Sequence, residues 1–224
     1  MKTIASLLFY LLLSTVAFGQ YITVETIDKA LKKEVTDLKE MANTIVHEYP
    51  LDQNGGFTYV LVVEAPGQTK EQLYITLNAW LLRNFDGKGI LINDKDLGCI
   101  MAHERLHRIA ANGAFASSNT NYEVDIEPTI RADIKDGKVR ITYNVPCYEL
   151  KDVTSKVWGK QAFKKNKSRS LQFSESYPYN PHGKEKKMMT KALVFTHYYS
   201  TLIISDIEKA IKVGVVGNEA DDDW

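Results

Sequence analysis

The residues best suited to chemistry are His103, Glu104 and His107, which match the pattern H-E-x-x-H. On a helix, residues four apart lie about 6 Å from each other on one face, so both imidazoles can bind one Zn²⁺ while the glutamate acts as a general base in a peptidase. On a strand the two histidines share a face but stand roughly 13 Å apart, because each step covers about 3.3 Å. The zinc site therefore requires a helix at 103–107, and the local apolar spacing fits a helix and a strand equally.

Few other reactive patterns occur in the sequence. It contains no glycine-rich phosphate loop and no G-x-S-x-G nucleophile elbow. We therefore assign no catalytic, cofactor-binding or metal-binding residue and expect no cofactor. The chain has 224 residues, and its 28 basic residues balance its 28 acidic residues. Because nucleic-acid binding depends on a surplus of Lys and Arg, we expect no nucleic-acid partner.

The first 19 residues have the layout of a secretory signal peptide. Lys2 precedes an apolar run from Ile4 to Phe18, and cleavage is expected between Gly19 and Gln20. The run is too short for a transmembrane anchor, which needs about 20 apolar residues. The sequence therefore predicts export to the periplasm or beyond the cell, no transmembrane segment after cleavage, and a mature chain with 27 basic and 28 acidic residues.

The segments that must position any site begin with a helix and a strand. Within 20–47, apolar residues recur at spacings of four and three, which predicts an amphipathic helix over 26–47. The run 57–65 is rich in β-branched and aromatic residues and predicts a strand.

A second helix is expected to follow that strand. Thr69 with Gln72 forms a capping-box pattern, which is typical of a helix start. The apolar spacing then predicts a buried stripe made of Leu73, Leu77, Trp80 and Leu81.

The clearest local pattern lies between residues 121 and 145. Alternate residues are apolar over 121–134, which predicts one continuous strand with a buried face and a solvent face. Asp136 and Gly137 form a dipeptide typical of a hairpin turn in which both central residues take positive φ. The second arm, 138–145, then sets Ile134 opposite Val139 and Asp133 opposite Arg140. The charged residues expected on the solvent face are Glu123, Asp125, Glu127, Arg131, Asp133, Lys138 and Arg140.

The remaining segments differ in charge. Residues 146–187 hold ten Lys or Arg against four acids, and they predict a loop-rich basic excursion, with an anionic or polysaccharide contact as the sharper alternative. Helical spacing returns over 188–213, and 214–224 is an acidic tail.

The order of these segments and several residues resemble a secreted family of unknown function from Bacteroidetes with a TATA-binding-protein-like (TBP-like) fold. The residues that carry the resemblance are Tyr59, Val62 to Gly67, Thr69 to Tyr74, Trp80, Phe85, Asp94 to Gly98 and Asp136 to Arg140. The resemblance implies an α+β domain over 48–213 with a β-α-β-β-β-β-α core, an antiparallel sheet that carries two helices on one face. The N-terminal helix is an addition to this core. No catalytic residue is implied.

The resemblance also bears on the histidines and the cysteines. It makes 94–98 the turn into the third strand, so that His103 falls in or just beyond a strand and the H-E-x-x-H match is incidental. Glu123 and Glu127, the candidates for a third zinc ligand, then point into solvent. Cys99 enters the third strand and Cys147 leaves the fifth, so we expect them at opposite ends of the sheet as free, largely buried thiols.

Val60 and Val62 should face away from the helices in this arrangement. Either the N-terminal helix covers them, or they mediate self-association through an exposed patch. We therefore interpret the chain as an exported, non-enzymatic binding or assembly module of the cell envelope. Its expected partner is an envelope protein or an anionic ligand. The alternative function is a zinc-dependent peptidase that uses His103, Glu104 and His107.

Overall fold

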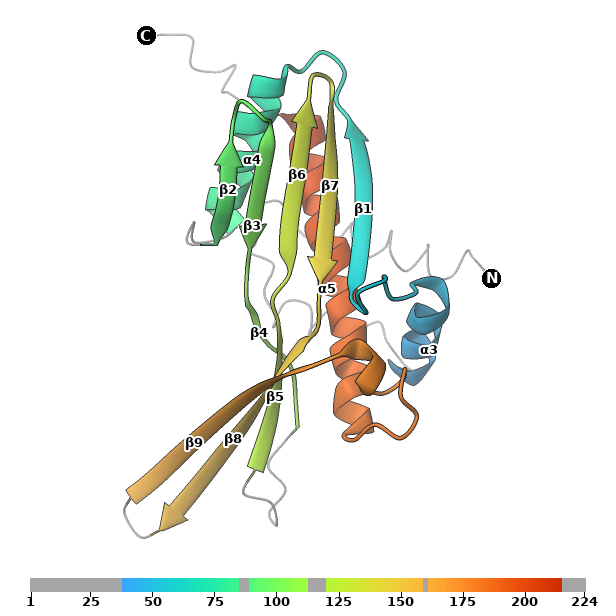
Figure 1. Ribbon diagram of the computed structural model, residues 1–224, viewed down its shortest axis with the longest axis vertical. Helices are drawn as coiled ribbons and strands as arrows, with labels where there is room; N and C mark the ends of the chain where they lie inside the picture. The colour runs from blue at the N-terminus through green and yellow to red at the C-terminus, as the bar shows by residue number, and fades with distance from the viewer. Residues whose placement is uncertain (1–37, 85–88, 113–119, 159–160, 215–224) are drawn as a thin grey trace. The chain divides into compact units, whose positions relative to one another are not determined.

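Five strands form an antiparallel sheet, here named sheet A, in the order β1-β7-β6-β3-β2 (Figure 1). The computed structural model describes residues 38–84, 89–112, 120–158 and 161–214. The strands of sheet A are β1 (Phe57–Glu64), β2 (Ile90–Asp94), β3 (Cys99–His103), β6 (Thr129–Lys135) and β7 (Lys138–Val145).

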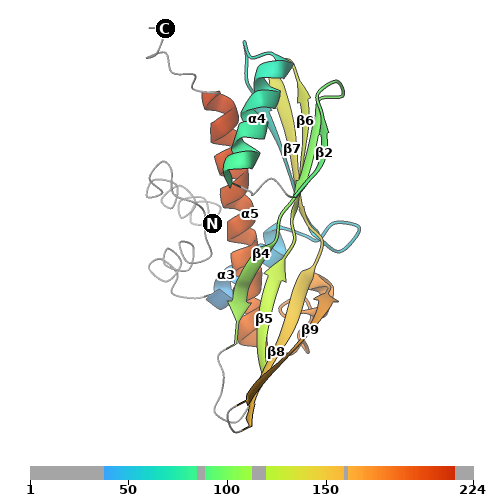
Figure 2. The same cartoon turned by 90° about the vertical axis from the view of Figure 1, so that its left-hand side faces the viewer.

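Two helices cover one face of sheet A. They are α4 (Lys70–Asn84) and α5 (Lys186–Val213), and both lie on the same side of the strands (Figure 2). The expected capping box starts α4: the Thr69 N–H donates to the side chain of Gln72 at 2.8 Å, and the Gln72 N–H donates to the Thr69 hydroxyl at 3.2 Å. The predicted stripe of Leu73, Leu77, Trp80 and Leu81 is buried. These elements give the expected β-α-β-β-β-β-α core.

A third helix, α3 (Leu38–Glu48), precedes the core and packs against α5. It confirms the C-terminal part of the amphipathic helix expected over 26–47, and its apolar residues Ala42 and Ile45 are buried. The part of that helix before residue 38 lies outside the described residues, as do the signal peptide predicted at 1–19 and the tail from residue 215. No helix in the described part of the chain is long and apolar enough to span a membrane.

The hairpin of β6 and β7 has the register that the sequence predicts. Ile134 pairs with Val139 and Asp133 pairs with Arg140. The turn itself differs from the expectation, because Gly137 has a φ of 72° while Asp136 keeps an ordinary negative φ. One residue with positive φ therefore suffices for this turn, and the glycine provides it.

A second antiparallel sheet, here named sheet B, was not anticipated. Its order is β4-β5-β8-β9, and β4 packs on α5. Its strands are β4 (Leu106–Ala111), β5 (Thr120–Ile126), β8 (Tyr148–Trp158) and β9 (Gln161–Leu171). Two sequence predictions are therefore wrong. Residues 121–134 are not one strand, because Glu127 and Pro128 separate β5 from β6, which lie in different sheets.

The second error concerns the basic stretch 146–187. Most of it is not loop but the long hairpin of β8 and β9, whose register runs unbroken from the pair Tyr148–Leu171 to the pair Trp158–Gln161. The described residues of this stretch that are irregular are Pro146, Cys147 and those between Leu171 and the start of α5, apart from the 3₁₀ turn Phe173–Glu175.

Candidate functional site

The H-E-x-x-H residues do not lie on a helix. His103 is the last residue of β3 and pairs with Thr129 in sheet A, whereas His107 belongs to β4 in sheet B. Glu104 lies in the connection between them, where its N–H donates to the Pro128 carbonyl at 3.1 Å. Among the described residues, no three His, Cys, Asp or Glu side chains gather closely enough to hold a metal ion. The helical geometry that a zinc peptidase of this type requires is therefore not formed.

His107 instead belongs to a charged cluster centred on Asp125. The Asp125 side chain is only 1% exposed, although the sequence pattern placed it in solvent. Its carboxylate accepts hydrogen bonds from Lys151 Nζ at 2.5 Å and from the Arg108 N–H at 2.8 Å, and it lies 3.0 Å from His107 Nδ1. Arg108 has a φ of 56°, at the bulge where the register of β4 and β5 shifts. Asp125 of β5 thus connects Arg108, at the bulge in β4, with Lys151 of β8.

The acidity of Asp125 follows from these contacts. Burial alone would raise the pKa of its carboxyl group, but the hydrogen bonds from Lys151, from the Arg108 backbone and from His107 outweigh burial and hold the pKa below its usual value. The candidate zinc ligands nearby are also paired: Glu127 forms an ion pair with Arg105, and Glu123 lies 3.4 Å from Arg108. A carboxylate held ionised by fixed partners suits a structural role better than proton transfer.

The other face of sheet A carries none of the described helices. Because side chains alternate along a strand, the cross-strand pairs define rows of neighbours that run across this open face. One row consists of Val60, Thr142, Arg131, Met101 and Ile92. The next consists of Val62, Arg140, Asp133, Cys99 and Asp94.

An Arg–Asp–Arg bridge occupies the middle of the open face. Asp133 accepts hydrogen bonds from Arg131 at 2.9 Å and from Arg140 at 2.8 Å, which confirms the predicted pairing of Asp133 with Arg140. Beside this bridge Val60 is 62% exposed and Val62 is 51% exposed. The helix α3 packs on α5, so the described part of the N-terminal helix leaves these valines uncovered.

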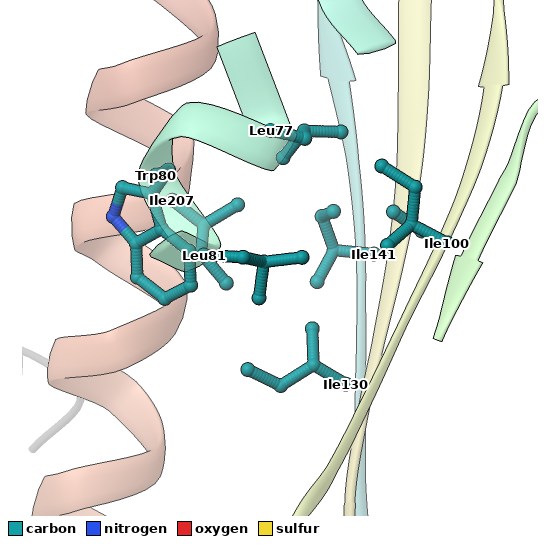
Figure 3. Close-up of a pocket in the computed structure, with 8 residues that line it drawn as sticks. Leu77, Trp80, Leu81, Ile100, Ile130, Ile141 and Ile207 are labelled. Atoms are coloured by element: carbon teal, nitrogen blue, oxygen red, sulfur yellow. The ribbon is translucent and has the colours of Figure 1, made fainter. Parts of the chain in front are cut away.

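A small gap lies between sheet A and its helices. Figure 3 shows Leu77, Trp80 and Leu81 of α4 and Ile207 of α5 directed toward the sheet residues Ile100, Ile130 and Ile141. All of the residues that line this small gap are apolar, so the gap lacks the convergent polar groups that orient a small molecule. The gap is part of the core, and the open face is the better candidate for recognition.

Comparison with known proteins agrees with this fold. Residues 59–149 match the family described as a domain of unknown function (DUF4468) with TBP-like fold. This segment, which is less than half of the chain, is similar to the DUF4468 family. It begins in β1 and ends in the first residues of β8, so it contains the other strands of sheet A and the helix α4. The family and the TBP-like α+β fold expected from the sequence are confirmed.

Two solved structures are similar to the chain. One is a TBP-like protein from Parabacteroides distasonis ATCC 8503, with 14% identity and a TM-score of 0.48 over 72% of this chain and 96% of that chain. The other is a DUF4468 family protein from Bacteroides ovatus ATCC 8483, with 13% identity and a TM-score of 0.45 over 74% of this chain and 94% of that chain. A search of the curated proteins found no match to this chain.

The two cysteines, Cys99 and Cys147, are free thiols, as expected. Cys99 begins β3, opposite Asp133, whereas Cys147 follows the far end of β7, so they lie at opposite ends of sheet A. Both are partly exposed rather than largely buried. Burial raises the pKa of the Cys147 thiol, and the nearby Glu149 carboxylate raises it further, so Cys147 is a poor nucleophile.

Sequence reasoning missed a half-buried histidine on the helix α5. His197 of α5 packs against Tyr49 in a tilted arrangement, with ring centroids 4.3 Å apart, and its Nδ1 lies 3.0 Å from the Tyr59 hydroxyl. Burial lowers the pKa of His197 to about 4, so the imidazole is neutral at physiological pH. The helical spacing over 188–213 predicted a helix here but carried no sign that residue 197 contacts Tyr59.

Proposed function

We propose that the chain is an exported, non-enzymatic binding module of the cell envelope, and that the open face of sheet A is its recognition surface. One observation carries the proposal: no described helix packs on this face, which presents exposed Val60 and Val62 beside the Arg131–Asp133–Arg140 bridge. Exposed apolar side chains flanked by charged groups are typical of protein interfaces.

The chemistry of the described residues supports a binding role over an enzymatic one. The H-E-x-x-H histidines lie in strands of different sheets, and Asp125 is neutralised by Lys151. The layout of residues 1–19 supports export, and the partner is then a protein of the envelope. A contact between the basic residues of 146–187 and an anionic ligand is a weaker proposal, because Lys151 already has a buried counterion.

Site-specific photo-crosslinking in intact cells tests the recognition surface. A photoreactive residue at Thr142, in the middle of the open face, should give an adduct with an envelope protein. The same residue at Ile75, an exposed apolar position on α4, is the matched control and should give none. Adducts from both positions, or from Ile75 alone, would refute the proposal for this face.

Cell fractionation tests the export. The full chain should be found in the envelope or the medium, and a chain that lacks residues 1–19 should stay in the cytoplasm. If both forms have the same location, the N-terminal segment is not an export signal.

A further inference from the structure

The two edges of sheet A differ in how well they are protected. The edge strand β2 has five residues, and its register shifts between Ile90 and Ile92. The edge strand β1 has eight residues and pairs with β7 without interruption from Phe57 to Glu64. Among the described strands, none pairs with the other side of β1. A long, regular edge presents a row of backbone groups to another strand.

The hydrogen-bond pattern shows which residues of β1 present those groups. The Ala65 N–H donates to the Gly137 carbonyl at 2.8 Å, directly after the last β1–β7 pair. Because antiparallel bonding alternates residue by residue, the odd-numbered residues of β1 bond to β7. The backbone N–H and C=O groups of Thr58, Val60, Val62 and Glu64 therefore point toward the free edge.

The same even-numbered residues place their side chains on the open face. Val60 and Val62 are exposed there, and β-branched side chains are those that pack best across paired strands. Leu61 lies between them, half-buried on the helix side. The edge thus offers apolar side chains on both faces around its midpoint, together with backbone groups that no described strand pairs.

We propose that two copies of the chain pair through the free edges of β1, with Val60 of one copy opposite Val62 of the second copy. The two strands are antiparallel and the two-fold axis passes beside Leu61. Two five-stranded sheets become one continuous ten-stranded sheet.

The proposed register is self-complementary. A two-fold axis at Leu61 gives two Val60–Val62 pairs. In each pair the N–H and C=O groups of both residues point toward the other strand, so the two residues exchange hydrogen bonds. It also sets Glu64 opposite Thr58 of the second copy, and no like charges face each other. Within its own sheet Glu64 already lies opposite Lys138. A register that moves the axis to Glu64 would place two glutamates opposite each other, which is unfavourable.

The inference concerns the chain alone and needs neither export nor an envelope partner. Sedimentation velocity of the purified mature chain, residues 20–224, should therefore show a dimer that dissociates on dilution. The double variant V60K/V62K places like charges opposite each other, and its dissociation constant should rise by at least roughly tenfold. V213K, which changes an exposed valine at the end of α5, is the matched control and should dimerise normally.

Disulfide trapping then tests the register in a C99A/C147A background. L61C should cross-link to itself, because residues on the axis form a non-hydrogen-bonded pair with Cα atoms about 4.5 Å apart. V60C alone should not cross-link, whereas a mixture of V60C and V62C chains should. A chain that is monomeric at all concentrations overturns the proposal. So does a dimer that survives V60K/V62K, or one in which V60C cross-links to itself and L61C does not. The crosslinking at Thr142 is a separate measurement, so either proposal can fail alone.

Discussion

The Tyr59 hydroxyl lies 3.0 Å from Nδ1 of His197, and this contact joins the edge strand β1 to the helix α5. Both groups are largely withdrawn from water, so burial raises the pKa of Tyr59 and lowers the pKa of His197 to about 4. The ring neighbours of His197 are the tyrosines Tyr49, Tyr59 and Tyr198, which are uncharged at neutral pH. The protein therefore folds around a neutral imidazole.

Acid should destabilise the protein through His197. In the unfolded chain a histidine has a pKa of about 6.5, so between pH 6.5 and 4 the unfolded state binds a proton that the folded state does not. The free energy of unfolding should therefore fall as the pH falls through this window, by about 3 kcal/mol in total. Urea unfolding at pH 7.5, 6, 5 and 4 measures this slope.

Two variants assign the slope to His197. His197→Gln cannot titrate and should flatten the pH dependence between 6.5 and 4. His182→Gln changes an exposed histidine and is the matched control, in which the slope caused by His197 should persist. Equal slopes in the wild-type protein and His197→Gln would show that the imidazole titrates normally in the folded state.

Loss of the Asp125 carboxylate should be costly. Asp125→Ala leaves Lys151, which is 24% exposed, without its counterion and frees the Arg108 N–H. Removal of one partner of a buried ion pair typically costs about 3 kcal/mol or more. Chemical unfolding at pH 7 should show a loss of this size.

Asp133→Ala is the matched control for that loss. Asp133 also bridges two cations, but Arg131 and Arg140 are about half exposed, and such surface pairs contribute roughly 1 kcal/mol or less. If the two variants lose equal stability, the burial of Asp125 does not make its ion pair more important for stability than the exposed pairs of Asp133.

Sheet A could be predicted from the sequence because its signals are local. Thr69 with Gln72 caps α4, and alternation on either side of Asp136 and Gly137 sets a register that both arms satisfy. The break between β5 and β6 was missed because the apolar alternation continues in phase from Ile126 to Ile130. Pro128, which has no N–H to donate, was the sign that the strand ends there.

Sheet B could not be predicted for two physical reasons. Its outer strand β9 is an edge strand whose sequence is rich in basic residues (Lys164, Lys165, Lys167 and Arg169), and these residues obscure the apolar alternation that would predict a strand. The second reason is that the burial of Asp125 depends on contacts with other strands. Its partners Arg108 and Lys151 lie in β4 and β8, and the bulge in β4 brings Arg108 to Asp125, so the local sequence around Asp125 does not show that it is buried.

Metal analysis should separate the binding module from the zinc peptidase. Since His103 and His107 lie in different sheets, His103→Ala should not change the zinc content of the purified mature protein. Glu104→Gln, the matched change at the general-base position, should likewise leave any peptidase signal at background. Stoichiometric zinc that disappears in His103→Ala would contradict the strand assignment at 99–107.

A glycine before β3 should tolerate no side chain. Gly98 has a φ of 66°, and a Cβ there would lie 2.6 Å from the Ile134 carbonyl oxygen of the neighbouring strand, so Gly98→Ala should lose about 3 kcal/mol. Gly67→Ala is the matched control, because Gly67 has a φ of 85° but nothing within 4 Å of the added Cβ. Its free energy of unfolding should fall by about 1 kcal/mol, which is the cost of placing an alanine at positive φ. Urea unfolding of both variants measures the difference, which isolates the close approach of residue 98 to β6. Equal losses would mean that β3 shifts away from β6 to make room for the methyl group.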